Sequence, residues 1–312
     1  MNSQAIATKK LQPSAQRSPL LRREAIEGLL CITPWLLGFL FFTAGPMLAS
    51  VWLALTDYEI LRPISFTGLA NFSKAAQDPL FLKSLWNTAY YTALYVPLHL
   101  ITALLVALLL NVKAKGVGVY RVLYYIPSIM PAVASAFLWM WIFNPNYGLA
   151  NALLNMIGLP PQKWIFDETL AKPSFVIMAL WGLGSSMLVF LAGLQGIDKV
   201  LYEASDIDGA NSWTKFWRIT LPMMTPVLFF NLIIGIIGSF QVFTTAFVAT
   251  KGGPNNATLF YVLYIYRQGW EFTKMGYASA LAWVLFVVVL LVTLTQFKLA
   301  GRWVYYETEK SG

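Results

Sequence analysis

The sequence predicts an all-α, polytopic membrane protein with six transmembrane helices and a short cytoplasmic loop of two helices. Three observations predict this fold class. Of the 312 residues, 58% are hydrophobic and only 12% are charged, against roughly 25% charged in an ordinary soluble domain. The charged residues are clustered, and six uncharged runs of 23 to 41 residues lie between the clusters. Each run exceeds the roughly 20 residues that cross a bilayer as a helix, so a soluble enzyme is excluded.

The uncharged runs are residues 28–56, 84–112, 122–162, 173–197, 219–250 and 275–297. Lipid offers no hydrogen-bond partners, so we expect each run to be a helix, which pairs its backbone groups within the segment. The first run is too long for the core of a signal peptide and is predicted to be retained. The predicted organisation is a cytoplasmic tail over 1–27, a six-span domain over 28–297 with a loop at 197–222, and a cytoplasmic tail over 298–312.

The distribution of Lys and Arg predicts the orientation. If the N-terminus is cytoplasmic, the inner segments hold 14 of these residues and the outer segments hold 8. The excess of positive charge on the cytoplasmic side favours both termini inside. The net charge of +8 is therefore mostly a consequence of topology and does not indicate nucleic acid as a partner.

Chemistry-bearing residues are scarce in the predicted spans. His99 is the only residue there that could titrate, because the six runs contain no Asp, Glu, Lys or Arg. It is either a proton or substrate contact or, as we expect, a neutral imidazole bonded to a neighbouring helix. One His and one Cys cannot form a clustered metal site, and the phosphate-binding G-x-x-x-x-G-K-[ST] motif is absent. We therefore expect no cofactor, no metal and no catalytic residue in this chain, and any energy must come from a partner.

The loop at 197–222 is the most informative segment. Asp198 can cap the start of a helix, and Gly209 can supply the left-handed residue that ends it. Ser212 can cap a second helix, and Pro222 marks its stop or a kink. The aromatic and apolar residues of this second helix fall at helical spacing on one face, namely Trp213, Phe216, Trp217 and Leu221.

An alternative for this loop is an amphipathic hairpin lying on the lipid headgroups. The first predicted helix carries four acidic residues and one basic residue, which are Asp198, Glu203, Asp206, Asp208 and Lys199. An acidic face avoids an anionic leaflet, so a protein partner suits the loop better.

The loop resembles a known motif. Glu203-Ala204-Ser205, Gly209 and Ile219-Thr220-Leu221-Pro222 are similar to the E-A-A…G…I-x-L-P motif of permease subunits in binding-protein-dependent ABC importers. Ser205 stands where the motif has Ala, a change of one small residue for another. The resemblance implies that the loop couples the spans to an ATPase. The implied coupling residues are Glu203, Ala204, Ser205, Asp208, Gly209, Leu221 and Pro222.

A narrower resemblance covers nearly the whole chain and points to MalF-like permeases of sugar importers. It rests on motifs spread over the spans and loops, namely Leu85-Trp86-Asn87-Thr88, Tyr124-Tyr125-Ile126-Pro127 with Pro131, Trp141-Ile142-Phe143-Asn144-Pro145, Gly252-Gly253-Pro254 and Gly276-Tyr277-Ala278-Ser279-Ala280. The two extra leading spans and the large extracytoplasmic loop of the enterobacterial maltose subunit are missing here. Contacts made by those parts cannot be transferred to this chain.

The resemblance implies a set of partners. They are a second, homologous permease that completes a heterodimer, two cytoplasmic ATPase subunits that bind ATP and Mg, an extracytoplasmic solute-binding protein, a sugar substrate and membrane lipid. The implied location is the cytoplasmic (inner) membrane of a bacterium or archaeon. Closure of the ATPases would rock the spans between inward-facing and outward-facing states.

Candidate residues of the substrate pathway come from aligning the span motifs of this family. They are Ser128, Ser186, Ser239 and Gln241. The alternative for each is ordinary packing of small polar residues between membrane helices. We expect Trp139, Trp181 and Phe240 to be lipid-facing or core aromatics rather than faces on which a sugar stacks.

Other functions remain open from the sequence. The same importer class could carry glycerol-3-phosphate, a glycerophosphodiester or a polyol. An intramembrane transferase would need a catalytic carboxylate pair, and the extracytoplasmic carboxylates show no such spacing. A purely structural anchor would leave the 197–222 loop unexplained.

Overall fold

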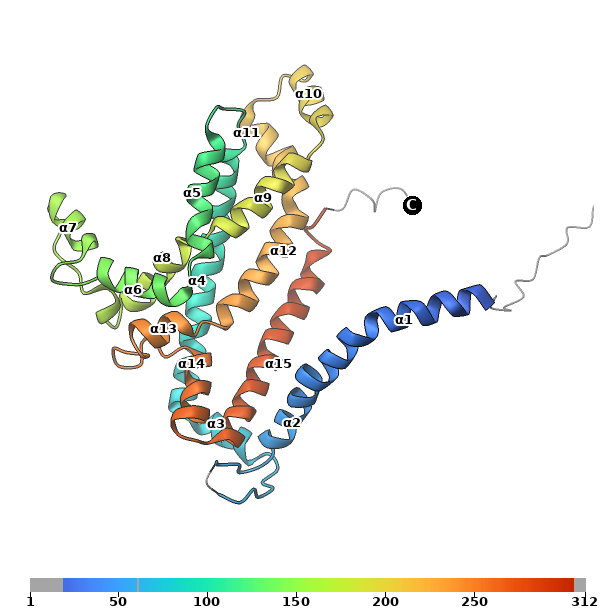
Figure 1. Cartoon of the computed structure of the whole chain (residues 1–312). Helices are drawn as coiled ribbons and strands as arrows, with labels where there is room; N and C mark the ends of the chain where they lie inside the picture. Colours follow the sequence, from blue (N-terminus) through green and yellow to red (C-terminus); the bar gives the residue numbers. More distant parts are fainter. Residues whose placement is uncertain (1–18, 61, 306–312) are drawn as a thin grey trace, which may run out of the picture. The chain divides into compact units, whose positions relative to one another are not determined.

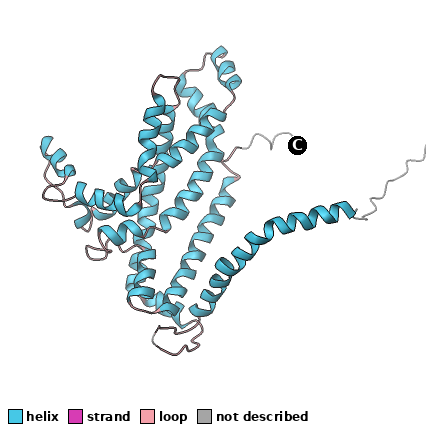
Figure 2. Cartoon of the chain, in the orientation of Figure 1, coloured by secondary structure: helices cyan, strands magenta, loops and turns pink. Residues whose placement is uncertain are grey.

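The computed structural model describes residues 19–60 and 62–305, and within them the chain is built of helices and connecting loops (Figures 1 and 2). The only β-type pairing in these ranges is an isolated bridge between Thr56 and Phe66. The predicted all-α class is confirmed. The chain forms two compact units, residues 1–52 and 53–312.

The described part of the first unit is one long apolar helix. It comprises α1 (Pro19–Phe39), a π-helical turn η1 (Leu40–Ala44) and most of α2 (Gly45–Ala54). Residues 23–54 of this stretch qualify as a membrane span, and no residue of its apolar window is buried. The helix begins within the predicted 1–27 tail, whereas residues 1–18 of that tail lie outside the described residues.

The second unit holds the remaining helices. In chain order they are α3 (Ala70–Gln77), α4 (Pro79–Leu110), α5 (Val117–Ile129), α6 (Ala132–Ile142), α7 (Leu149–Met156), the 3-10 turn η2 (Trp164–Phe166), α8 (Ala171–Leu180), α9 (Gly184–Gly196), α10 (Lys199–Ile207), α11 (Ser212–Lys215), the π-helical turn η3 (Phe216–Thr220), α12 (Leu221–Phe240), α13 (Thr244–Ala249), α14 (Tyr261–Tyr266), the π-helical turn η4 (Arg267–Glu271) and α15 (Met275–Ala300).

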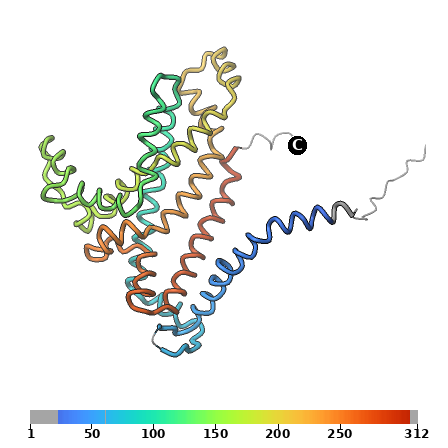
Figure 3. Tube along the Cα trace, viewed as in Figure 1, coloured from blue at the N-terminus to red at the C-terminus, as the bar shows by residue number. Residues whose placement is uncertain are grey.

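Two of the six predicted spans are broken. Four helical stretches are long and apolar enough to cross a membrane, and two more pass only as bent pairs. The pair α5–α6 bends by 100° and the pair α8–α9 by 50°, and the first bend can be followed in Figure 3. Pro131 explains it, because the residue before a proline is pushed out of the helical region and Met130 is extended, with ψ 140°. The run 122–162 therefore holds a bent pair of helices, and the described chain has six spans if each bent pair counts as one.

The second unit contains two hydrophobic cores that lie one beyond the other along α4. The loop-side core, near the 197–222 loop, includes Ala103, Met187, Phe190 and Met224 among its buried members. We call the other one the distal core, and its buried members come from α4, α8, α13, α14 and α15 among other segments. Because α4 contributes side chains to both, it joins the two cores in one unbroken helix.

Asp78 fixes the distal end of α4. Its Oδ1 accepts hydrogen bonds from the backbone N–H of Leu80 (2.9 Å) and Phe81 (3.4 Å), which makes it the N-cap. Its Oδ2 accepts from the hydroxyl of Tyr277 on α15 (2.8 Å) and from that of Tyr264 on α14. Burial raises the pKa of Asp78, but these hydrogen bonds outweigh burial, so the pKa is lowered below its ordinary value.

Replacement of Asp78 by Asn should destabilise the second unit. An amide cannot accept all four hydrogen bonds, and the loss of a charged acceptor costs about 1–3 kcal/mol. Lowering the pH should reproduce the effect in the wild type. The stabilisation by Asp78 is complete above the ordinary pKa of 3.8 and disappears as the pH falls through the lower folded-state value.

The measurement is thermal unfolding of the protein in detergent at a series of pH values. Asp57→Asn is the matched control, because Asp57 is an exposed carboxylate. Equal unfolding temperatures for both variants would contradict the role given to Asp78.

Candidate coupling loop and membrane cavity

The first helix of the 197–222 loop forms as the sequence predicts. The side chain of Asp198 caps α10, because its Oδ1 accepts from the N–H of Val200 at 2.9 Å. Gly209 ends the helix in the left-handed region, at φ +71°. The N–H of Ala210 donates to the carbonyl of Ser205 (2.9 Å) and that of Gly209 to Asp206 (3.1 Å), which together form a Schellman motif.

The second helix differs from the prediction in two respects. Asn211, not Ser212, is the cap, since its Oδ1 accepts from the N–H of Thr214 at 2.8 Å. Pro222 does not stop the helix, which continues past it to Phe240. The π-helical turn η3 immediately before it joins α11 to α12 without a break.

Three contacts fix α10 to α11, to η3 and to the loop-side core. The hydroxyl of Tyr202 lies 2.9 Å from that of Thr220 in η3. Asp206 on α10 and Lys215 on α11 form an ion pair. The ring of Tyr202 also packs against the loop-side core, so α10 is fixed to the start of α12.

Some of the predicted coupling residues are exposed, and the others are half-buried. Glu203, Ala204, Asp208 and Gly209 are exposed, and so is the neighbouring Ile207, whose side chain is 89% accessible. Ser205 is half-buried, and its hydroxyl donates to the carbonyl of Tyr202 at 2.7 Å. Leu221 and Pro222 are half-buried in the first turn of α12. The C-terminal half of α10 and the residues that end it therefore expose the carboxylates of Glu203 and Asp208 beside the apolar side chain of Ile207.

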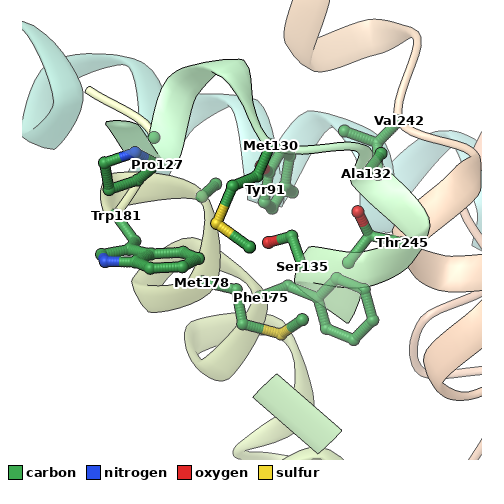
Figure 4. Close-up of a pocket in the computed structure, with 12 residues that line it drawn as sticks. Tyr91, Pro127, Met130, Ala132, Ser135, Phe175, Met178, Trp181, Val242 and Thr245 are labelled. Atoms are coloured by element: carbon green, nitrogen blue, oxygen red, sulfur yellow. The ribbon is translucent and has the colours of Figure 1, made fainter. Parts of the chain in front are cut away.

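A cavity of about 180 Å³ lies where the two broken spans meet α4. Its lining comes from α4, the bend between α5 and α6, α8, the break before α9 and the segment after α12. Figure 4 shows Pro127 and Trp181 on one side and Val242 and Thr245 on the other. None of the described residues that line it is Asp, Glu, Lys or Arg. The wall combines aromatic faces with the hydroxyl groups of Tyr91, Ser135 and Thr245.

None of the four predicted pathway residues lines this cavity. Ser128 and Ser239 donate to carbonyls of their own helices, at 2.7 and 2.8 Å. Ser186 lies 2.9 Å from Nε2 of His99, which gives this histidine the neighbouring-helix partner that we expected. Gln241 is exposed. Ser128 and Gln241 adjoin cavity residues in the sequence, and all four remain predictions.

The cavity is lined by residues that the sequence did not single out, such as Ser135 and Thr245, and by Trp181, which we expected to be a lipid-facing or core aromatic. The ring of Trp139 packs edge-on against Trp181, with centroids 5.9 Å apart. In the described part of the chain, the buried Nε1 of Trp139 and Oγ1 of Thr92 have no hydrogen-bond partner. Buried polar atoms of this kind usually pair with water or a ligand. The proline-induced break at Met130 was the one sequence signal that could have located the cavity.

Comparison with known proteins agrees with the motif in the loop. Residues 99–304 match the family described as binding-protein-dependent transport system inner membrane component. The chain is 41% identical over 300 residues to the probable ABC transporter permease protein YesP of Bacillus subtilis (strain 168), covering 95% of this chain and 97% of that protein. It is 36% identical over 287 residues to the trehalose/maltose transport system permease protein MalF of Thermococcus litoralis, covering 91% and 97%.

One solved structure has a closely similar fold. It is the crystal structure of a bacterial alginate ABC transporter in complex with a periplasmic protein that carries an alginate pentasaccharide. The match has a TM-score of 0.81 at 25% identity and covers 92% of this chain and 98% of that chain.

Gly209 generates a prediction about the local stability of α10. Replacement by Ala should weaken the end of the helix by about 1–2 kcal/mol, because a side chain disfavours the left-handed region. A Cβ there meets no atom within 4 Å, so the cost comes from the backbone alone. Hydrogen exchange of the amides of residues 199–210 measures the change. Gly196→Ala is the control, since Gly196 is helical and also has open space. Equal exchange in both variants would contradict the prediction.

Proposed function

This chain belongs to the inner membrane components of binding-protein-dependent transport systems, and from that membership we propose that it forms one half of the pathway of an ATP-driven sugar importer. It is a transporter subunit rather than an enzyme, and it works in an importer that includes a solute-binding protein. We further propose that a second, homologous permease completes the pathway. Two ATPase subunits would bind ATP and Mg, since the chain contains no phosphate-binding motif.

One observation carries the proposal. Helix α10 is held on α11 and η3 by the Asp206–Lys215 ion pair and the Tyr202–Thr220 hydrogen bond. Helices α11, η3 and α12 continue without a break to Phe240. The segment that follows α12 contributes Val242 and Thr245 to the cavity wall. A displacement of α10 by an ATPase would therefore move one wall of the cavity through a single helical rod. This is the mechanical link that an ATP-driven permease requires.

The cavity favours a neutral sugar over the other solutes. Sugars are bound by hydroxyl groups and aromatic faces, and both types line this cavity. Glycerol-3-phosphate or a glycerophosphodiester would need a cation near the phosphate, and no described lining residue carries one. A polyol remains the second candidate, because it shares the hydroxyl chemistry. Ser128, Ser186, Ser239 and Gln241 are proposed as further contacts along the pathway.

The proposed orientation places α10 and both termini in the cytoplasm of a bacterial or archaeal cell. The family and the several apolar helices support a multi-pass inner-membrane location. The excess of Lys and Arg in the segments on the α10 side supports the orientation.

Charge reversal at Glu203 should uncouple the transporter. Glu203→Lys places a cation where a carboxylate is expected to meet the ATPase, and the loss of such a buried contact costs about 2–5 kcal/mol. We expect ATPase co-purification and solute-stimulated ATP hydrolysis to fall at least tenfold, while the amount of inserted permease stays unchanged. The purified chain alone should hydrolyse no ATP.

The control for this variant is Asp57→Lys, which reverses an exposed charge remote in sequence from α10. If Glu203→Lys retains wild-type coupling, α10 is not the ATPase contact. Stimulated hydrolysis that is lost equally in both variants would point to a general effect of charge instead.

Labelling of single cysteines tests the orientation. Cys31 is the only cysteine, so Cys31→Ser gives a clean background. An impermeant thiol reagent added to intact cells should modify Asn146→Cys and Asn255→Cys, which are exposed positions on the proposed outer side. It should not modify Lys115→Cys or Ser212→Cys unless the membrane is permeabilised. The opposite pattern would invert the topology.

A further inference from the structure

A groove of about 270 Å³ opens beside the start of α12, where α10 and the end of the described chain meet. Among the described residues that line it, Arg218 is the only charged one. The others are apolar or aromatic, namely Leu201 of α10, Ile219 of η3, Pro222 and Met223 of α12, and Tyr305. The groove therefore combines one cation with an apolar wall.

The residues after α15 run along α12 into this groove. The ring of Trp303 packs edge-on against Phe229 of α12, with centroids 5.9 Å apart. The N–H of Tyr305 donates to Oγ1 of Thr225 at 2.9 Å. Between these two contacts the chain moves toward the first turn of α12. We call residues 301–305 the C-terminal strap, and its last residue forms part of the groove wall.

The charge of Arg218 is not neutralised within the described ranges. Lys215, three residues earlier, is paired with Asp206 of α10. In the same ranges, the ion pairs involve other cations than Arg218, whose side chain is exposed. None of the described lining residues is Asp or Glu. The groove is therefore suited to an anion.

Arg218 also marks the boundary of the membrane domain. The uncharged run 219–250 begins with the next residue, and the run 275–297 ends directly before Lys298 of α15. Lipid phosphates lie just outside the hydrocarbon core, and Trp and Tyr are enriched at that level. Trp303 and Tyr305 of the C-terminal strap are exposed. The groove is thus placed where lipid headgroups lie.

The acidic character of α10 does not extend into the groove. Leu201 and Glu203 are two residues apart, which is just over half a turn of a helix, so they point to different sides of α10. Leu201 lines the groove, whereas Glu203 is exposed. A ligand in the groove would therefore leave Glu203 accessible to an ATPase.

We propose that this groove binds an anionic phospholipid of the cytoplasmic leaflet. The phosphate accepts two parallel hydrogen bonds from the guanidinium of Arg218. The glycerol backbone and the first part of an acyl chain lie against Pro222, Met223 and Tyr305. A zwitterionic headgroup is disfavoured, because its ammonium group finds no carboxylate among the described lining residues. Anionic lipids are present in the cytoplasmic leaflet, so the inference rests on the proposed orientation of α10.

Hydrogen exchange within the assembled transporter tests the site. The complex is purified in detergent, and phosphatidylglycerol is titrated as the probe. It should slow amide exchange in residues 301–305 and in α10, and phosphatidylcholine should not. Arg218→Gln should raise the midpoint of the titration by about tenfold, because a hydrogen-bonded contact to a charged group is lost.

Matched variants separate a site from general attraction of charge. Lys115→Gln removes an exposed cation from the loop between α4 and α5, outside the groove, and should leave the midpoint unchanged. Arg218→Lys keeps the charge without the paired N–H groups and should give an intermediate midpoint. It serves as the test variant if Arg218→Gln does not assemble. Met223→Trp fills the groove, keeps Arg218, and should abolish the slowing of exchange.

Three results would overturn the proposal. The first is equal slowing by phosphatidylcholine and phosphatidylglycerol. The second is an unchanged midpoint in Arg218→Gln, or a shift of the same size in Lys115→Gln. The third is equal slowing by soluble glycerol phosphate at the same concentration, because the acyl chain would then contribute nothing.

The next segment of the chain is the competing occupant. Residues 306–312 follow Tyr305 and contain Glu307 and Glu309. Their removal should leave the midpoint unchanged. A midpoint about tenfold lower after removal would assign the groove to this segment and overturn the lipid site.

The lipid test is independent of transport. It uses neither solute nor ATP, and detergent exposes both faces of the protein. A failed lipid test therefore leaves the results for Glu203→Lys and for cysteine labelling standing. Failed coupling with the expected slowing of exchange would count against the proposed function alone.

Discussion

The second unit depends on the unbroken helix α4. It is 32 residues long, it is capped by Asp78, and its side chains enter both the distal and the loop-side core. The neighbouring helices α8, α9, α12 and α14 all pack on it. Two of these neighbours, α8 and α9, are the halves of one broken span. Both halves pack on α4, so they run in different directions and still share one supporting helix. Without it the two cores would have no common helix.

The breaks in the other spans have a physical cost that explains where they lie. Backbone groups freed by a break cannot be paired by lipid, so broken helices in membranes occur where they are buried or line a polar cavity. Both breaks in the second unit border the cavity, whose wall also carries the hydroxyl groups of Tyr91, Ser135 and Thr245. The breaks that make the spans irregular therefore also supply part of the wall of this cavity.

Helix α12 connects the 197–222 loop to the cavity wall. At one end of the continuous helix α11–η3–α12, α10 is held by the Tyr202–Thr220 hydrogen bond and the Asp206–Lys215 ion pair. At the other end, the chain passes directly into the cavity wall. The π-helical turn η3 keeps the rod continuous past Pro222. The ATPase contact and the solute contact that we propose would thus share one continuous helix.

The sequence by itself determined the features that depend on local chemistry. Runs without charge predicted the spans, because burying charge in lipid is too costly, and Asp198 and Gly209 predicted the ends of α10, because caps act within a few residues. Tertiary structure decided the rest. Asn211 rather than Ser212 caps α11, and helix continuation through Pro222 depends on the π turn before it. The bend angles, and hence which of Ser128, Ser135, Trp181 or Gln241 faces the cavity, are set by packing between segments far apart in the chain. The periodicity of one helix carries no information about that packing.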